Sequence, residues 1–252
     1  MRDGAQARVA GSAWTLAPRT SAAWKIAEPW RLYAAYGRGF RPPEARNYDD
    51  APKMTAADTA ELGLHWLPGP RLRIGGSAFA SFLESESFYD HVSGSFLELD
   101  ASRRLGAEFE LEMRPSPTWR LGADLSYVDA RFVESRSPIP YAPWLVAGGR
   151  AYWQSPNGSQ AGLRIRYLAP RHLPHGARGS SQVVADLLAA HTWKDFRLAL
   201  EVENLFDTRN REGEFHFPSR PDPRQPASRL PALHFVPGPP LGARLTLSAH
   251  LP

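Results

Sequence analysis

The chain has 252 residues, no cysteine, and 30 basic against 26 acidic side chains, which gives a formal net charge of +4. The length suits one large domain, and the lack of cysteine excludes disulfide frameworks, thiolate metal sites and cysteine nucleophiles. The arginines are scattered singly, which argues against a nucleic-acid partner. No window approaches the roughly 18 apolar residues of a membrane helix, and the first residues do not open a secretory signal.

Alternation of apolar and polar side chains runs through the chain from its start. Period two is typical of β-strands, because successive side chains point to opposite faces. Most of the segments are about ten residues long, the length that a tilted strand needs to cross a bilayer. Strands are predicted near 5–17, 20–28, 30–40, 60–66, 71–82, 102–113, 119–127, 142–153, 160–167, 182–193, 196–203 and 243–251. The sequence therefore predicts an all-β protein with about twelve strands.

The connections between these strands alternate between short and long. Pro, Gly and Asn in the short ones are ordinary turn residues. An antiparallel meander with short turns at one end and long loops at the other is typical of transmembrane barrels, whose short turns are periplasmic and whose long loops are extracellular. Short links lie at 28–29, 68–70, 114–117, 154–158 and 194–195, and long ones at 41–56, 86–101, 135–141, 170–181 and 207–240.

Five tryptophans lie within a few residues of the five short links, on the strand face that carries the apolar side chains. Indole favours the lipid headgroup layer, because its ring is apolar while its N–H needs a partner. We therefore predict a membrane-interface belt. The alternative is a soluble β-sandwich binding module with tryptophans in its core. The predicted belt residues are Trp30, Trp66, Trp119, Trp153 and Trp193.

The other strand face carries charges of both signs. Charged side chains are costly against lipid, so this face is expected to line a wide, hydrated or plugged lumen. The residues expected there are Arg31, Arg73, Arg104, Glu108, Glu110, Arg120, Asp124, Arg150, Arg164, Arg166, Asp186, Arg197, Glu201 and Arg244.

Four short segments resemble motifs of the TonB-dependent outer-membrane receptors, in the order found in the second half of that family's barrel. Residues 30–44 resemble its "Y…RGFR.P" segment, 58–66 its "E.G" strand, 106–110 its "G.E.E" strand and 202–207 its "V.NLFD" signature. The resemblance covers nearly the whole chain and implies an antiparallel up-and-down transmembrane β-barrel. The motif positions are Arg38, Gly39, Phe40, Pro42, Glu61, Gly63, Gly106, Glu108, Glu110, Asn204, Leu205, Phe206 and Asp207.

The function that this resemblance implies depends on the plug and the first barrel half of the family, which have no counterpart in these 252 residues. Members of the family import scarce ligands, such as ferric siderophores or cobalamin, across the outer membrane of Gram-negative bacteria. Their barrel of about 22 strands holds an N-terminal plug, which contacts the energy-transducing TonB complex. Residues 1–252 are then expected to form the C-terminal part of such a receptor barrel. Its expected partners are outer-membrane lipid, the missing barrel half and plug, and the TonB complex only if the plug is supplied.

The predicted sheet has two edge strands that need partners. Strands near 5–17 and 241–251 would both be edges, and unpaired backbone cannot be left in hydrocarbon. Either the edges pair with a missing half, or the chain closes by itself as a small stand-alone pore of about twelve strands. Asn204 and Asp207 are expected to end the strand at 196–203 by bonding their own backbone, which releases the longest loop.

Other candidate sites are weaker. His172, His175, His216 and His234 could converge on a metal, although loop histidines of this kind are ordinarily solvated. No Ser, His and Asp set is recognisable. We expect no enzyme activity, no cofactor and no metal site.

A row of carboxylates and a long loop lead to different expectations: no chemical role for the first and a functional role for the second. Glu108, Glu110 and Glu112 share one strand face, and a wet lumen with arginines nearby explains them without acid–base chemistry. Loop 207–240 mixes Arg, Asp, Pro and aromatic residues and is the best candidate for gating or ligand contact. The ligand itself is not predicted.

Overall fold

The computed structural model describes residues 14–41, 54–220, 222–226 and 228–249. Within them, eleven strands form one antiparallel sheet in which the neighbours follow chain order, apart from two small hairpins that stand outside it. This is the predicted up-and-down meander. Its strands are β1 (Arg19–Ala27), β2 (Trp30–Arg41), β3 (Thr55–Gly69), β4 (Leu72–Leu83), β7 (Ser102–Ser116), β8 (Trp119–Phe132), β9 (Leu145–Gln154), β10 (Ser159–Leu168), β11 (Gln182–Trp193), β12 (Phe196–Glu203) and β15 (Gly242–Ala249).

All eleven strands coincide with predicted ones, and the twelfth prediction is not confirmed. The strand expected near 5–17 falls largely outside the described residues, and residues 14–17, which are described, belong to no strand. The end of the last strand, at 250–251, also lies outside the described residues.

The predicted long connections contain regular structure of their own. One hairpin pairs β5 (Glu86–Asp90) with β6 (Ser95–Leu99), and a second pairs β13 (Arg211–Pro218) with β14 (Pro231–Pro237). A single 3-10 turn, η1 (Pro174–Gly176), lies between β10 and β11. No helix in the described part of the chain is long and apolar enough to cross a membrane.

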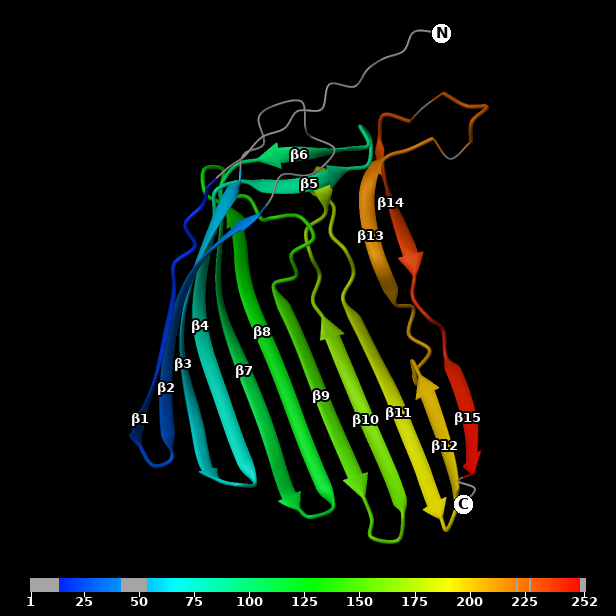
Figure 1. Ribbon diagram of the computed structural model, residues 1–252. Helices are drawn as coiled ribbons and strands as arrows, with labels where there is room; N and C mark the ends of the chain where they lie inside the picture. The colour runs from blue at the N-terminus through cyan, green and yellow to red at the C-terminus, as the bar shows by residue number, and fades with distance from the viewer. Residues whose placement is uncertain (1–13, 42–53, 221, 227, 250–252) are drawn as a thin grey trace.

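The sheet is curved and open, with all short turns at one end and all long connections at the other (Figure 1). β1 and β15 are the two ends of the strand order and do not pair with each other in the described structure. The β-sandwich alternative is wrong, because the strands belong to one large sheet rather than to two sheets packed face to face. The described sheet is also not the closed small pore that was the other alternative.

Buried apolar side chains gather at the long-loop end rather than between layers. Ala130, Phe132 and Ile139 are buried there, with Leu99 and Val128 packed against them. Elsewhere large apolar side chains remain exposed along the sheet, for example Leu125 at 40% and Ile165 at 40%. A curved single sheet that exposes apolar side chains along its length is what a barrel wall in lipid requires.

Candidate functional site

The strand register separates two faces of the sheet. Because directly paired residues in an antiparallel ladder share a face, Trp30 with Trp66 and Trp119 with Trp153 lie on the same side as the apolar sets. We call this side the outer face. The opposite side, which carries all fourteen charged residues expected in the lumen, is called the inner face.

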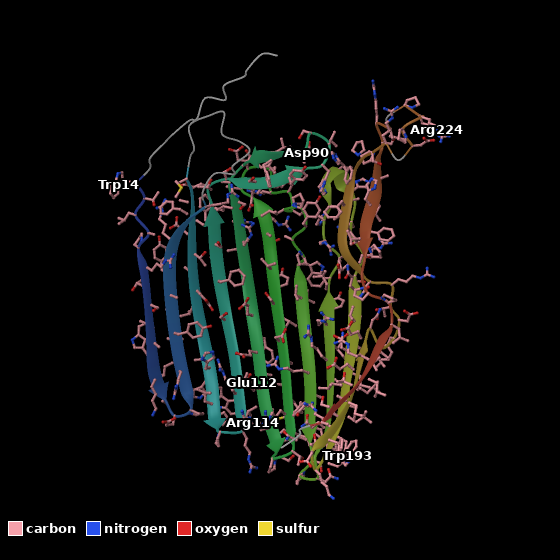
Figure 2. The ribbon with its side chains drawn as sticks, turned by 45° about the vertical axis from the view of Figure 1, so that its right-hand side comes forward. Trp14, Asp90, Glu112, Arg114, Trp193 and Arg224 are labelled. Atoms are coloured by element: carbon pink, nitrogen blue, oxygen red, sulfur yellow. The ribbon has the colours of Figure 1, made fainter. Side chains whose placement is uncertain are left out.

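The predicted tryptophans lie on the outer face at the short-turn end. The rings of Trp30 and Trp66 stack with centroids 5.9 Å apart, and those of Trp193 and Phe196 with centroids 6.2 Å apart. Figure 2 shows Trp193 at this end of the molecule and Asp90 at the other. The structure thus brings the residues together at one rim, and their contact with the headgroup layer stays a prediction.

A second aromatic row lies on the same outer face near the long-loop end. Tyr36, Tyr127 and Tyr167 are paired with Ala60, Ala107 and Ala147, all of the outer face. Trp144 packs edge-on against Tyr127, with ring centroids 6.3 Å apart. The sequence analysis missed this row, although each tyrosine stands near the end of an alternating apolar set. Two aromatic rows with an apolar band between them are typical of transmembrane barrels.

The inner face carries cross-strand ion pairs. Arg166 lies 2.9 Å from Asp186, and Arg73 lies 3.4 Å from Glu110. Arg150 lies 3.4 Å from both Glu112 and Asp124. These pairs are exposed to solvent, so they contribute more to strand register than to stability.

Two hollows open on this face. One of about 650 Å³ is lined by Arg150, Arg164, Arg166 and Arg211, among others. The other, of about 460 Å³, is lined by His65, Glu108 and Glu110, among others. The inner face is therefore polar, wet and uneven, as a surface that receives a plug would be.

Aromatic side chains of the inner face lie across glycines of the next strand. The hydroxyl of Tyr33 donates to Glu61 at 2.8 Å, and a Cβ at Gly63 would lie 2.2 Å from the Tyr33 ring. A Cβ at Gly106 would lie 2.3 Å from the Phe79 ring and 2.6 Å from a backbone oxygen. A larger residue at Gly63 would have to displace the Tyr33 ring, and at Gly106 it would also meet the Tyr127 carbonyl of the neighbouring strand.

The first motif lies at the long-loop end. Arg38 is on the outer face, 3.5 Å from Glu84 and 3.8 Å from Asp58, with its guanidinium 5.8 Å from the Phe40 ring centre. A Cβ at Gly39 would meet no atom within 4 Å. Pro42 lies outside the described residues. Arg38 therefore ties the upper ends of β2, β3 and β4 together.

Asn204 ends β12. It is buried at 2% exposure, its backbone adopts φ +49°, and its side-chain amide donates to the carbonyls of Thr208 at 2.9 Å and Pro239 at 3.0 Å. Its side-chain oxygen accepts from the Thr208 N–H at 3.0 Å. Asp207 accepts from the N–H of Leu241 at 3.1 Å. The prediction that the residue bonds nearby backbone where the strand ends is confirmed for Asn204, through Thr208. It is not met by Asp207, whose side chain accepts instead from Leu241 at the returning end of the loop.

Asn204→Ala is expected to lower the free energy of unfolding by about 3 kcal/mol, because three backbone groups lose a partner in a buried site. The measurement is chemical denaturation in detergent or vesicles. Asn157→Ala, at an exposed turn with one bond to Ser159 at 3.2 Å, is the matched control and should cost under about 1 kcal/mol. Equal losses at the two positions would contradict the role given to Asn204.

The two hairpins meet at the long-loop end through aromatic rings, a contact that we call the hairpin contact. The His91 ring lies 4.8 Å from Phe215 and stacks on Phe217 at 4.9 Å. His234 stacks on Phe217 at 4.3 Å. Segments more than a hundred residues apart in sequence therefore join over one rim of the sheet (Figure 1).

A buried carboxylate anchors the second hairpin. Glu214 is 1% exposed, accepts bonds from Ser180 and from Arg211 at 2.8 Å, and lies 3.4 Å from Arg171. Burial alone would raise the pKa of Glu214, but the bonds from Ser180 and Arg211 and the charge of Arg171 outweigh it and hold that pKa below its ordinary value. Sequence inspection missed this site because one glutamate in a polar loop carries no pattern.

The histidines raised as metal candidates are dispersed. The rings of His175 and His216 lie 6.3 Å apart, and His216 Nδ1 is 3.0 Å from the Pro174 carbonyl. No group of three or more metal-ligating side chains occurs among the described residues. On the inner face, Glu110 and Glu112 pair with arginines, and Glu108 accepts from Ser126 at 3.4 Å.

Known proteins share the sheet geometry described above. The family model described as "TonB dependent receptor-like, beta-barrel" matches residues 2–205. No curated protein matches the chain. Among solved structures, the ferric-catecholate import receptor Fiu of E. coli K12 is 20% identical with a TM-score of 0.67, over 92% of this chain and 30% of that one.

Two further receptors share the fold. The ferric yersiniabactin uptake receptor FyuA of Yersinia pestis is 15% identical with a TM-score of 0.71, over 92% of this chain and 37% of that one. The ferric enterobactin receptor PfeA of Pseudomonas aeruginosa is 15% identical with a TM-score of 0.71, over 92% of this chain and 40% of that one. The chain thus spans between 30% and 40% of the length of these receptors.

Proposed function

The chain belongs to the TonB-dependent receptor family, and from this membership we propose that it forms the C-terminal part of an outer-membrane barrel that imports a ferric-siderophore-like ligand. The fold is that of an outer-membrane barrel wall. Fiu, FyuA and PfeA are named for ferric ligands, which supports the same ligand class here. The family's transporters and receptors are not enzymes, and we propose no catalytic role.

The observation that carries the proposal is that the sheet formed by the described residues is open and has an odd number of strands. β1 and β15 both run from the long-loop end to the short-turn end, because they are the first and last of eleven strands that alternate in direction. An antiparallel closure therefore needs an odd number of further strands, each edge meeting a strand of opposite direction. A second copy of the described sheet would meet β15 in parallel and does not fit. Bacterial outer-membrane barrels have an even number of strands, so a complete barrel would need an odd number beyond these eleven, which is about eleven for a barrel of about 22.

The partners follow from this geometry. We propose that the barrel half completing both edges and the plug that it carries are the direct partners, with outer-membrane lipid against the outer face. The wet, ion-paired inner face supports contact with a plug. The TonB complex is a partner only through that plug.

The long-loop rim supports a role in ligand contact. The hairpin contact joins the loop 207–240 to the β5–β6 hairpin, and Arg211 lies 4.4 Å above the Phe235 ring. Arginine and aromatic side chains together suit an anionic ligand with planar groups. We propose the loop 207–240 as the part of this chain that gates the lumen or contacts the ligand.

The absence of cysteine makes a clean topology test possible. We propose single-cysteine variants Arg224→Cys at the long-loop end and Asn157→Cys in a short turn, produced with a secretion signal together with a plug and a first barrel half. A membrane-impermeant maleimide should label Arg224→Cys on intact cells, and Asn157→Cys only after permeabilisation. Equal labelling on intact cells, or recovery of the chain in the soluble periplasm, would overturn the proposal.

A further inference from the structure

β14 is an edge strand that stands beyond the end of β15. Among the described residues it pairs only with β13, so its other edge has no backbone partner there. Figure 1 shows β14 above β15 on the same flank of the molecule, with both strands running toward the short-turn end. The link between them, 238–241, is held at the end of β12, because Asn204 donates to the Pro239 carbonyl at 3.0 Å and Asp207 accepts from the Leu241 N–H at 3.1 Å. β14 therefore prolongs the open edge that β15 begins.

The free edge of β14 presents the backbone groups of two residues. The N–H of Gly238, the residue after β14, donates to the carbonyl of Asn210, the residue before β13, at 3.1 Å. Because N–H groups alternate between the two edges of a strand, the even-numbered residues of β14 also direct theirs to β13. The odd-numbered residues face the free edge. The prolines at the two ends of β14 have no N–H, so Leu233 and Phe235 are the residues that present one there.

The side chains of these two residues are apolar and accessible. Leu233 is 42% exposed and Phe235 is 51% exposed. β14 contains no Asp, Glu, Lys or Arg, whereas β5, β6 and β13 each contain at least one. Exposed edge strands are commonly protected by charged side chains, because an apolar edge with free backbone groups pairs readily with another strand. The composition of β14 thus suits an edge that is covered by a further strand.

We propose that β14 extends the junction between the two barrel halves beyond the membrane-spanning sheet. The strand of the missing half that pairs with β15 continues past it and pairs with β14. Because β14 and β15 run in the same direction, one strand of opposite direction is antiparallel to both. This proposal rests on the closure given under the proposed function and adds the chemistry of the partner segment, which is apolar opposite Leu233 and Phe235.

The length and direction of the strands favour this occupant over a second copy of the chain. β15 has 8 residues, whereas β3 and β7 have 15 each, so strands long enough to pass the end of β15 occur in this wall. A second copy in the same membrane orientation would present its own β14 running in the same direction. Two such edges cannot form an antiparallel pair.

The test uses the photo-crosslinking residue p-benzoylphenylalanine in the chain assembled with a plug and a first barrel half. It is placed in turn at Phe235 of β14, at Leu247 of β15 and, as a control, at Phe109 on the outer face of β7. Illumination should link Phe235 and Leu247 to one strand of the first half. The two linked sites should lie as far apart in that strand as Phe235 and Leu247 lie in this chain, and Phe109 should give no protein adduct.

Leu233→Pro removes one N–H from the free edge. It should lower the crosslinking yield from Phe235 about fivefold, the factor that one net hydrogen bond is worth, and leave the yield from Leu247 unchanged. Leu233→Val is the matched control, because it keeps the N–H and an apolar strand-forming side chain, and it should change neither yield. Hydrogen exchange at the β13 amides should stay as in the wild type, which shows that the hairpin has formed in Leu233→Pro.

The possible outcomes separate the extended junction from the closure itself. Adducts from Leu247 alone would overturn the proposal for β14 and leave the closure standing. So would adducts that join Phe235 to a second copy, to its own chain or to an unrelated protein. An unchanged yield from Phe235 in Leu233→Pro, with the hairpin intact, would exclude backbone pairing at β14. The loss of adducts at both positions would contradict the closure of the barrel as well.

Discussion

Leu125→Arg is expected to lower the free energy of unfolding by about 1–3 kcal/mol, because it places a charge in the lipid-facing band, between its middle and the aromatic row at Tyr127. Leu125 is 40% exposed on the outer face of β8, opposite Phe109 on β7. Its strand carries Trp119 toward one rim and Tyr127 toward the other. The measurement is denaturant unfolding from phospholipid vesicles, with the chain assembled together with its barrel half and plug.

Ser126→Arg is the matched control, one residue further along the same strand. Ser126 faces inward and lies 3.4 Å from Glu108, so an arginine there meets water and an acidic neighbour. The expected change is under about 1 kcal/mol. Similar losses at both positions would show that the face carrying the tryptophans does not meet lipid.

Glu214→Gln is expected to destabilise the β13–β14 hairpin by about 3 kcal/mol, because it leaves Arg171 and Arg211 without their shared carboxylate. The Glu214 side chain is fully buried, and a Cβ at Gly179 would lie 2.4 Å from one of its oxygens. Hydrogen exchange at the β13 amides measures the local opening. Glu212→Gln, exposed on the same strand, is the control and should leave exchange nearly unchanged.

The same carboxylate predicts a pH dependence with a definite sign. The folded pKa of Glu214 lies below its ordinary value of 4.5, so its contribution to stability is fully present above pH 4.5. That contribution is lost as the pH falls through the lowered folded pKa. Protection of the β13 amides should therefore drop in acid for the wild type, whereas Glu214→Gln should show a flatter profile. Equal acid sensitivity in both proteins would exclude Glu214 as the cause.

The eleven strands of the sheet could be predicted because each face of a barrel wall is in contact with a single environment, either lipid or water. Lipid on one face and water on the other impose period two over ten or more residues, as in 102–113, and this pattern is readable without knowing the neighbours. The short turns and the tryptophan belt followed for the same reason, since they are repeated at one rim. The belt's role in lipid, by contrast, is still to be tested by experiment.

The hairpins in the long loops could not be predicted, because their strands are short and stand in water on most sides. β5 and β6 have five residues each, which is too few for alternation to be distinguished from chance. The buried site at Glu214 joins residues 171, 180, 211 and 214 through loop folding alone. The second aromatic row also needed the register, which shows Tyr36, Tyr127 and Tyr167 on one face.

The sequence by itself determined the secondary structure of the sheet, the two chemically different faces and the family, because these depend on local periodicity and on short motifs. Only the tertiary structure decided which loops meet, that Glu214 is buried between Arg171 and Arg211, and that the first and last strands of the described sheet run in the same direction. The loop contacts and the buried carboxylate arise between segments far apart in sequence, and an alternation with a period of two residues carries no information about which loops come together.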